Sequence, residues 1–252
     1  MIIKVSYIII TWNGKQLLND LLHSMQRQLK RSDVEVIVVD NGSTDGTKEW
    51  LSTSYPQIHL INLSTNKGVA YARNRAMEKA KGKYLFILDN DIQITDAAVE
   101  GMELFMDDNP NVGIVGCRLV FPNGKIQESC KPYPGLKQKF HHLLCPDSTS
   151  FTYEKRIREA KPFEPEYIIG ACQMIRDTAH KQVGALDEHI FYGPEDCDYC
   201  IRLRADGWKV IYLPQYTMVH HCQRKTNHRP LSTLGRLHIK ALLYFYWKHK
   251  RL

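Results

Sequence analysis

The segment YLFILDNDIQI, residues 84–94, ends an apolar run with two aspartates, Asp89 and Asp91. The run before them has the length and residue types of a buried β-strand. Two carboxylates separated by one residue repel each other unless a positive charge lies beside them. A divalent cation such as Mg²⁺ or Mn²⁺ supplies that charge, because these ions prefer oxygen ligands. The segment therefore predicts a strand that delivers a metal-binding pair to the edge of a sheet.

Strand and helix patterns alternate around this segment. Apolar runs predict strands at the ranges 5–11, 34–40, 58–63 and 83–89, and helical patterns separate them at 14–30, from about Thr47, and at 68–82. This alternation is typical of an α/β fold, with a mostly parallel central sheet and helices on both faces. Ligands of such sheets bind at the carboxyl ends of the strands.

Polar side chains follow three of these strands where the strands end. Neither of the two common glycine-rich phosphate loops, G-x-G-x-x-G and G-x-x-x-x-G-K-[ST], occurs in the chain. Magnesium sites usually combine one or two carboxylates with substrate phosphates, so we expect a nucleoside diphosphate as the ligand. The residues that converge on this edge are Thr11, Asn13, Asp40, Ser43, Asp89 and Asp91.

The second half of the chain begins with a strand pattern at 111–121 and a long, weakly periodic segment at 122–166. A strand pattern follows at 166–177, then a helix from about 194 to 206, and then a strand that should end at Pro214. Glu195 and Asp196 stand at the start of that helix. There they either stabilise the helix dipole or supply a general base.

Two adjacent histidines, His220 and His221, follow the last strand. They are either a surface pair or the source of a third metal ligand. Together with Cys197, Cys200 and Cys222 they also have the spacing of a zinc site. Cys197 and Cys200 lie on the predicted helix, however, where they also fit a hydrophobic core.

The chain has 252 residues, a net charge of +7 and seven cysteines. The charge predicts an anionic partner: nucleic acid, a membrane surface or a phosphorylated small molecule. Nucleic acid is the least favoured, since no recognised binding motif accompanies the charge. Neither a signal peptide nor an apolar run of about 20 residues is present, so we expect a cytoplasmic protein with reduced thiols.

The range 228–252 predicts a basic, aromatic C-terminal helix. Leu234, Leu237, Ala241 and Phe245 form an apolar stripe that ends in a basic cluster of Lys248, Lys250 and Arg251. The stripe packs either on its own domain or on a second subunit of a homo-oligomer. The alternative is peripheral contact with the inner face of the cell membrane through residues 231–252, because aromatic and basic side chains suit lipid headgroups.

Seven segments, in this order, resemble glycosyltransferase family 2, the inverting enzymes with the GT-A fold. The similarity is closest to a bacterial, rhamnosyltransferase-like branch. The segments are VSYIIITWNG, VIVVDNGSTDGT, NKGVAYARNRA, LFILDNDI, IIGACQMIRD, LDEHIFYGPEDCDYCIRLRADGWKVIYLP and VHH. The resemblance implies a GT-A domain over 1–227, with a nucleotide-sugar half at 1–116 and an acceptor half at 117–227. It also implies sugar transfer from a nucleotide-diphospho-sugar to the hydroxyl of a saccharide or lipid-linked saccharide.

The resemblance also assigns roles to residues. Asp196 would be the catalytic base and Glu195 would help to position the acceptor. Mn²⁺ or Mg²⁺ would be held by Asp91, Asp89 and His220, with His221 as the alternate. Gly170 and Ala171 would border the acceptor cleft. The nucleotide sugar would contact Thr11, Asn13, Asp40, Ser43, Arg73, Asp89 and Asn90, with Arg73 near the phosphates.

Two other functions fit the same acidic residues. A sugar nucleotidyltransferase also uses a carboxylate-bound metal at a sheet edge and would release pyrophosphate. A catalytically inactive sugar-nucleotide-binding protein would turn over no donor. The intact D-N-D and E-D pairs argue against the inactive protein. Bacterial surface polysaccharide synthesis is the setting that the family implies.

Overall fold

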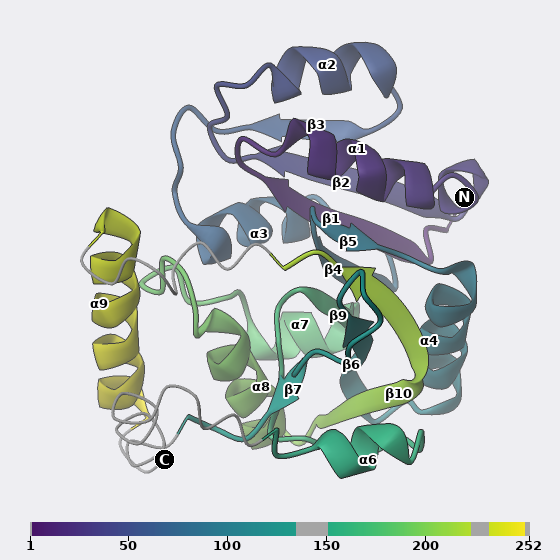
Figure 1. Cartoon of the computed structure of the whole chain (residues 1–252), viewed down its shortest axis with the longest axis vertical. Coiled ribbons are helices and arrows are strands. Elements are labelled where there is room, and N and C mark those ends of the chain that lie inside the picture. Colours follow the sequence, from purple (N-terminus) through teal and green to yellow (C-terminus); the bar gives the residue numbers. More distant parts are fainter. Residues whose placement is uncertain (1, 135–150, 223–231, 250–252) are drawn as a thin grey trace.

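The computed structural model describes residues 2–134, 151–222 and 232–249 (Figure 1). Its centre is an eight-stranded sheet with the order β3-β2-β1-β4-β9-β6-β10-β5. A two-stranded sheet pairs β7 (Cys130–Lys131) with β8 (Tyr167–Ile168). The strands of the large sheet are β1 (Val5–Thr11), β2 (Val34–Asp40), β3 (His59–Asn62), β4 (Tyr84–Asp89), β5 (Ile92–Gln93), β6 (Val112–Val120), β9 (Cys172–Arg176) and β10 (Lys209–His220).

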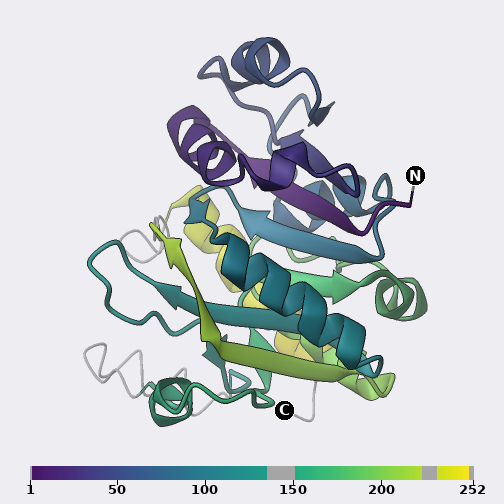
Figure 2. The same cartoon turned by 90° about the vertical axis from the view of Figure 1, so that its right-hand side faces the viewer.

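Helices cover both faces of the sheet, as predicted. Side chains of β1 and β4 alternate between two hydrophobic clusters: Tyr7 and Phe86 belong to one, Ile8 and Ile87 to the other. This alternation follows from the two-residue period of a strand. The first cluster includes α1 (Lys15–Ser24), α2 (Thr47–Ser54) and α4 (Asp96–Asp108), and Figure 2 shows α4 crossing that face. The second includes α3 (Val69–Met77), α6 (Glu154–Arg158), α7 (Asp177–Val183) and α8 (Glu195–Ala205).

The mostly parallel sheet is confirmed. Parallel pairs join β1 to β2 and β4, β2 to β3, and β6 to β10, whereas β9 runs antiparallel to both of its neighbours. The strand expected at 166–177 is divided into β8 and β9. The turn between them is shaped by Gly170, whose N–H and C=O bond to the side chains of Asp196 and Arg73. The prediction of a single strand over 166–177 is therefore wrong. Gly170, in the middle of this range, has its backbone N–H and C=O bonded to side chains instead of to a neighbouring strand.

The strand predicted to end at Pro214 continues to His220, which corrects that boundary. The register of β10 against β6 shifts between Leu213 and Thr217. Pro214 lies in this irregularity, where its missing N–H interrupts no ladder hydrogen bond. The extra length carries the end of β10 to the short strand β5, where His220 pairs with Ile92.

The helix boundaries also differ from the sequence pattern. The helix expected over 14–30 ends at Ser24 and is followed by a 3₁₀ turn at Gln28–Lys30. The helix expected over 68–82 ends at Met77. The C-terminal helix, α9 (Thr233–Lys248), lies at the side of the molecule away from α4 (Figure 1).

Candidate active site

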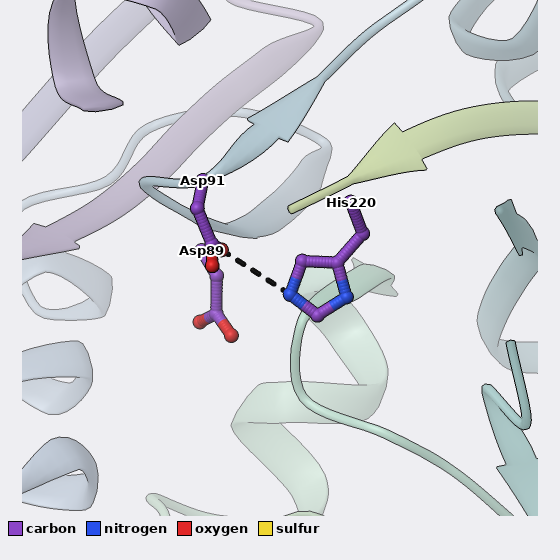
Figure 3. A group of neighbouring side chains, drawn as sticks. All are labelled: Asp89, Asp91 and His220. Atoms are coloured by element: carbon purple, nitrogen blue, oxygen red, sulfur yellow. Dashed lines mark ion pairs between the residues drawn. The ribbon is translucent and has the colours of Figure 1, made fainter. Parts of the chain in front are cut away.

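Three side chains that could hold a metal ion meet at the carboxyl edge of the sheet, and for this candidate role we call the two aspartates among them the metal-binding acids. Asp89 ends β4, Asp91 lies in the turn just before β5, and His220 ends β10. Each offers one ligand atom, and these atoms all lie within 4.8 Å of one another. Figure 3 shows the ring of His220 turned towards the two aspartates, with its Nε2 atom 3.2 Å from Oδ1 of Asp91.

The pairing of β5 with β10 decides which histidine faces the acids. The N–H of His221 donates to the carbonyl of Asp91 at 3.0 Å, while the His221 side chain is exposed. His220 is buried and its side chain points inwards. Neighbouring residues of a strand point to opposite faces, so only one histidine of the pair can join the aspartates. In this register it is His220.

The donor set of this centre fits a divalent cation. Two carboxylate groups and one imidazole are the ligands that Mn²⁺ accepts readily, and Mg²⁺ accepts the carboxylates. The zinc alternative is not supported: Cys197 and Cys200 lie on α8 with buried side chains, and among the described residues they join no group of side chains that could share an ion. Within residues 2–134, 151–222 and 232–249, Asp89, Asp91 and His220 are the one group of at least three such side chains close enough to share an ion.

Arg73 connects the metal-binding acids to the acids of α8. Its guanidinium is buried and donates to Oδ1 of Asp89 at 2.8 Å and to Oε1 of Glu195 at 3.1 Å. It also donates to the carbonyl of Gly170 at 2.8 Å. A Cβ atom at position 170 would lie 2.4 Å from the guanidinium, so glycine permits this close approach. Arg73 thus bonds to Asp89 and does not itself line the adjoining pocket.

Glu195 and Asp196 differ in their surroundings although they are adjacent. Glu195 is 5% exposed, and its Oε2 atom is buried without a hydrogen-bond partner among the described residues. Burial, together with the neighbouring charge of Asp196, raises the pKa of Glu195 to about 7, although the charge of Arg73 opposes the rise. The side chain of Glu195 therefore faces Arg73 and is mostly withdrawn from solvent.

The carboxylate of Asp196 is held by two backbone donors. Its Oδ2 accepts from the N–H of Gly170 at 2.9 Å and its Oδ1 from the N–H of Cys197 at 2.7 Å. Burial raises the pKa of Asp196, while these two hydrogen bonds oppose the rise. Ala171, the next residue after Gly170, accepts from the N–H of Asp89 at 3.0 Å. Gly170 and Ala171 thus form the short connection between the metal-binding acids and Asp196.

The predicted nucleotide-binding residues form two interlocked groups. Asn90 donates to the hydroxyl of Thr11 at 3.0 Å, which ties the ends of β4 and β1 together. The N–H of Asn13 donates to the hydroxyl of Ser43 at 2.9 Å, and the N–H of Ser43 donates to Asp40 at 2.8 Å. These bonds fix the loops after β1 and β2 against each other.

One pocket lies between these loops and the metal-binding acids. It is lined by four of the predicted site residues, Thr11, Asp89, Asn90 and Asp91. Asn13, Asp40, Ser43 and Arg73 are not among the residues that line it. Sequence reasoning did not assign the remaining lining residues to the site, although all but Leu17 lie within the segments quoted above. They are Ile10, Trp12, Gly14, Leu17, Asn41, Asn66, Gly68, Val69, Phe191 and Tyr192.

The loop before Glu195 closes one side of this pocket. The carbonyl of Phe191 accepts from the N–H of Val69 at 2.8 Å, at the start of α3. Gly68 has a φ of 91°, and a Cβ there would lie 2.6 Å from the same carbonyl. Glycine at this position therefore lets the loop that precedes the α8 acids reach the start of α3.

Comparison with known proteins agrees with this geometry. The chain is 25% identical to an N-acetylglucosaminyl-diphospho-decaprenol L-rhamnosyltransferase of Mycobacterium tuberculosis, over 96% of this chain and 84% of that protein. It is 28% identical to the dTDP-rhamnosyl transferase RfbF of Shigella flexneri, over 84% and 67%. Neither relative favours a nucleotidyltransferase or an inactive binding protein.

Solved structures share the fold. A mannosyltransferase of Pyrobaculum calidifontis, in complex with GDP-Man and Mn²⁺, matches with a TM-score of 0.68 and 21% identity, over 99% of this chain and 64% of that one. TarS of S. aureus matches with a TM-score of 0.62 and 20% identity, over 86% of this chain and 60% of that one. The chain thus spans somewhat under two thirds of these two solved chains.

A family model described as "Glycosyl transferase family 2" matches residues 6–184, the range that holds nearly all of β1 to β9 together with Asp89 and Asp91. The match covers well over half of the chain. The sheet topology and the placement of the acidic residues agree with it. This chain therefore belongs to glycosyltransferase family 2, has the GT-A fold, and is an enzyme that transfers a sugar from a nucleotide-sugar donor.

Proposed function

We propose that the enzyme moves a sugar, with inversion, from a nucleotide-diphospho-sugar to a hydroxyl of a lipid-linked saccharide during bacterial surface polysaccharide synthesis. The observation that carries this proposal is the hydrogen-bonded connection from Asp89 through Arg73 to Glu195, next to Asp196. It would place the proposed metal ligands and the proposed base at the same edge of the sheet. Such an edge is where α/β proteins bind nucleotides.

Asp89, Asp91 and His220 would hold Mn²⁺ or Mg²⁺. When bound, the ion would offset the negative charge that develops on the departing diphosphate. Asp91 would be the direct ligand, and Asp89 would lie nearer the ribose. Thr11, Asn90 and Asn41 present hydroxyl and amide groups to the pocket or its wall and would contact the nucleoside. Asn13, Asp40 and Ser43 would support these contacts by holding the loops after β1 and β2 together.

Asp196 would act as the general base. The acceptor hydroxyl gives its proton to the Asp196 carboxylate, and its oxygen forms a bond to the anomeric carbon. The bond from that carbon to the diphosphate oxygen breaks, and its electron pair leaves with the nucleoside diphosphate. Attack on the face opposite the leaving group inverts the configuration. Glu195 would keep Arg73 in place and help to position the acceptor beside Gly170 and Ala171.

A panel of nucleotide sugars tests the proposal. Each donor would be screened by thermal shift with Mn²⁺, because a bound donor raises the apparent stability by mass action. The stabilising donor would then be incubated with a lipid-linked saccharide, and the released nucleotide identified. A nucleoside diphosphate supports the proposal, whereas pyrophosphate release would indicate a nucleotidyltransferase. Absence of turnover with every donor and acceptor would indicate a binding protein.

The acceptor proposal has support from a relative and from α9. The mycobacterial relative is named for a decaprenol-linked diphosphate acceptor. In the part of the chain that the structure covers, no helix is long and apolar enough to span a bilayer. A lipid-linked acceptor would then be reached by peripheral contact at the inner face of the membrane, and α9 offers a surface for that contact.

One face of α9 packs on its own domain. Ala241 and Phe245 are buried there. Lys248 bonds to Asp187 at 2.6 Å and to Asp198 at 2.7 Å, and Tyr244 also donates to Asp187. Ala241, Phe245 and Lys248 of the predicted apolar stripe and basic cluster therefore pack on their own domain. Leu234, Lys250 and Arg251 lie outside the described side chains.

The opposite face of α9 is apolar and exposed. Ile239, Leu243 and Trp247 are 47%, 67% and 63% exposed and lie four residues apart, on one side of the helix. Exposed basic residues, Arg236 and Lys240, flank this stripe. Aliphatic and aromatic side chains beside cations suit an anionic membrane surface. His238, on the same helix, bonds to the carbonyl of Tyr192 at the pocket, so the bound membrane would lie close to the active site.

A further inference from the structure

Gln127 lies in the segment 122–166, for which the sequence predicts no regular element and no role. It is buried, and its backbone N–H donates to the carbonyl of Leu119 at 2.9 Å. The preceding residue, Ile126, pairs with Val120 of β6. These contacts fix the backbone beside the end of β10. Gln127 is therefore built into the sheet edge rather than carried on an exposed loop.

The side chain of Gln127 makes two hydrogen bonds to His220. Its Nε2 donates to the carbonyl oxygen of His220 at 2.7 Å, and its Oε1 lies 2.8 Å from Nδ1 of the imidazole ring. A carbonyl oxygen can only accept, so the amide nitrogen must face it. The amide oxygen then faces Nδ1 and can also only accept. Nδ1 of His220 must therefore carry a proton.

This assignment decides which nitrogen of His220 serves the metal centre. A neutral imidazole carries one proton, so with Nδ1 protonated the lone pair lies on Nε2. Nε2 is the nitrogen that lies 3.2 Å from Asp91 (Figure 3). Metal-binding histidines commonly donate their other N–H to a carbonyl or carboxylate, which fixes the ring and its tautomer. Gln127 occupies that position here.

We propose that Gln127 is the positioning residue of the metal centre. It holds His220 in the Nδ1–H tautomer, with Nε2 directed at Asp89 and Asp91, and so prepares the site for a divalent cation. The inference rests on the proposed metal centre and adds to it a residue outside the three ligands. If Gln127 had a purely structural role, its buried amide would need only to be hydrogen-bonded. Replacing Gln127 would then destabilise the fold but leave the tautomer of His220 unchanged.

The first test measures binding of Mn²⁺ alone, by electron paramagnetic resonance titration of the full chain. Gln127→Leu removes both hydrogen bonds at nearly constant volume, and should weaken Mn²⁺ binding by about 10–100-fold. Gln127→Glu keeps an acceptor for Nδ1–H and should restore most of the affinity. The matched control is Gln28→Leu, which removes another buried amide, bonded to Asp96 and Arg31, away from the three ligands.

The second test reads the tautomer directly. Histidine-selective ¹⁵N labelling and NMR of the metal-free protein should show a protonated Nδ1 on His220, and Gln127→Leu should lose this preference. A deprotonated Nδ1 in the unmodified protein overturns the proposal, as does unchanged Mn²⁺ affinity in Gln127→Leu. If the unmodified protein binds no Mn²⁺, the proposed metal centre itself fails, which is a different result.

Discussion

The guanidinium of Arg73 lies 3.1 Å from the carboxylate of Glu195, although 122 residues separate them in the chain. The same guanidinium holds Asp89, so one buried cation connects the metal-binding acids with the acids of α8. Removing one partner of a buried ion pair leaves the other charge uncompensated, and that costs more than the pair itself contributes. The acidic side chains of the site therefore depend on Arg73 for their placement.

Arg73→Met should destabilise the fold by about 3–5 kcal/mol, because Asp89 and Glu195 would both lose their buried cation. Adding Glu195→Gln to this variant should recover part of the lost stability, since the buried carboxylate of Glu195, left without its cation, is replaced by a neutral amide. A double-mutant cycle by urea unfolding would measure the coupling. Additive losses would mean that the two side chains do not interact energetically in solution.

Glu195→Gln should also change how stability depends on pH. The folded-state pKa of Glu195, about 7, lies above its ordinary value of 4.5, so the native state binds this proton more tightly than the unfolded state does. The stabilisation that the fold gains from protonated Glu195 is fully present below pH 4.5 and is lost as the pH rises through 7. The loss amounts to at most about 3 kcal/mol. Unfolding measured between pH 4.5 and 8 should show this decline in the unmodified protein and a smaller one in the variant.

Asp196→Asn should lower the rate of transfer by at least about 10²-fold, because an amide cannot accept the acceptor proton. Nucleotide binding should survive, since Asp196 bonds to Gly170 and Cys197 and does not line the nucleotide pocket. Steady-state rates and nucleotide calorimetry would be compared on the same preparation. Normal turnover would assign the base to Glu195 or to another group.

His220→Ala and His221→Ala are a matched pair that tests the metal centre. The first removes a ring that faces Asp91 and should weaken Mn²⁺-dependent nucleotide binding. The second removes an exposed ring and should leave that binding unchanged. Asp91→Ala should behave like His220→Ala. Calorimetry with and without Mn²⁺ gives the comparison, and equal affinities in all variants would refute the metal assignment.

Leu243→Ser combined with Trp247→Ser should reduce binding to anionic vesicles, because both exposed side chains of α9 would lose their apolar contact with the bilayer. Leu104→Ser, at an exposed leucine on α4, is the matched control. Sedimentation with phosphatidylglycerol vesicles, and with phosphatidylcholine vesicles for comparison, measures the effect. Unchanged sedimentation would exclude the membrane contact. A lower molecular mass of the variant in light scattering would instead indicate a homo-oligomer interface.

The sequence by itself determined the first four strands, the sheet class and the resemblance to the family. The hydrophobic period of β1, β2 and β4 is local, and the two aspartates stand directly after β4. The carboxyl ends of parallel strands share one edge, so Thr11, Asp40 and Asp89 could be brought together without coordinates. These features depend on neighbouring residues and on one general rule of sheet topology.

Only the tertiary structure decided between His220 and His221 and identified Gln127 and the two faces of α9. The register of β10 past Pro214 sets which histidine points inwards, and a shift by one residue would exchange them. The pairing of Arg73 with Glu195, and of Lys248 with Asp187 and Asp198, joins residues distant in the chain. Such contacts arise from packing between elements, and the local pattern of a single sequence carries no record of them.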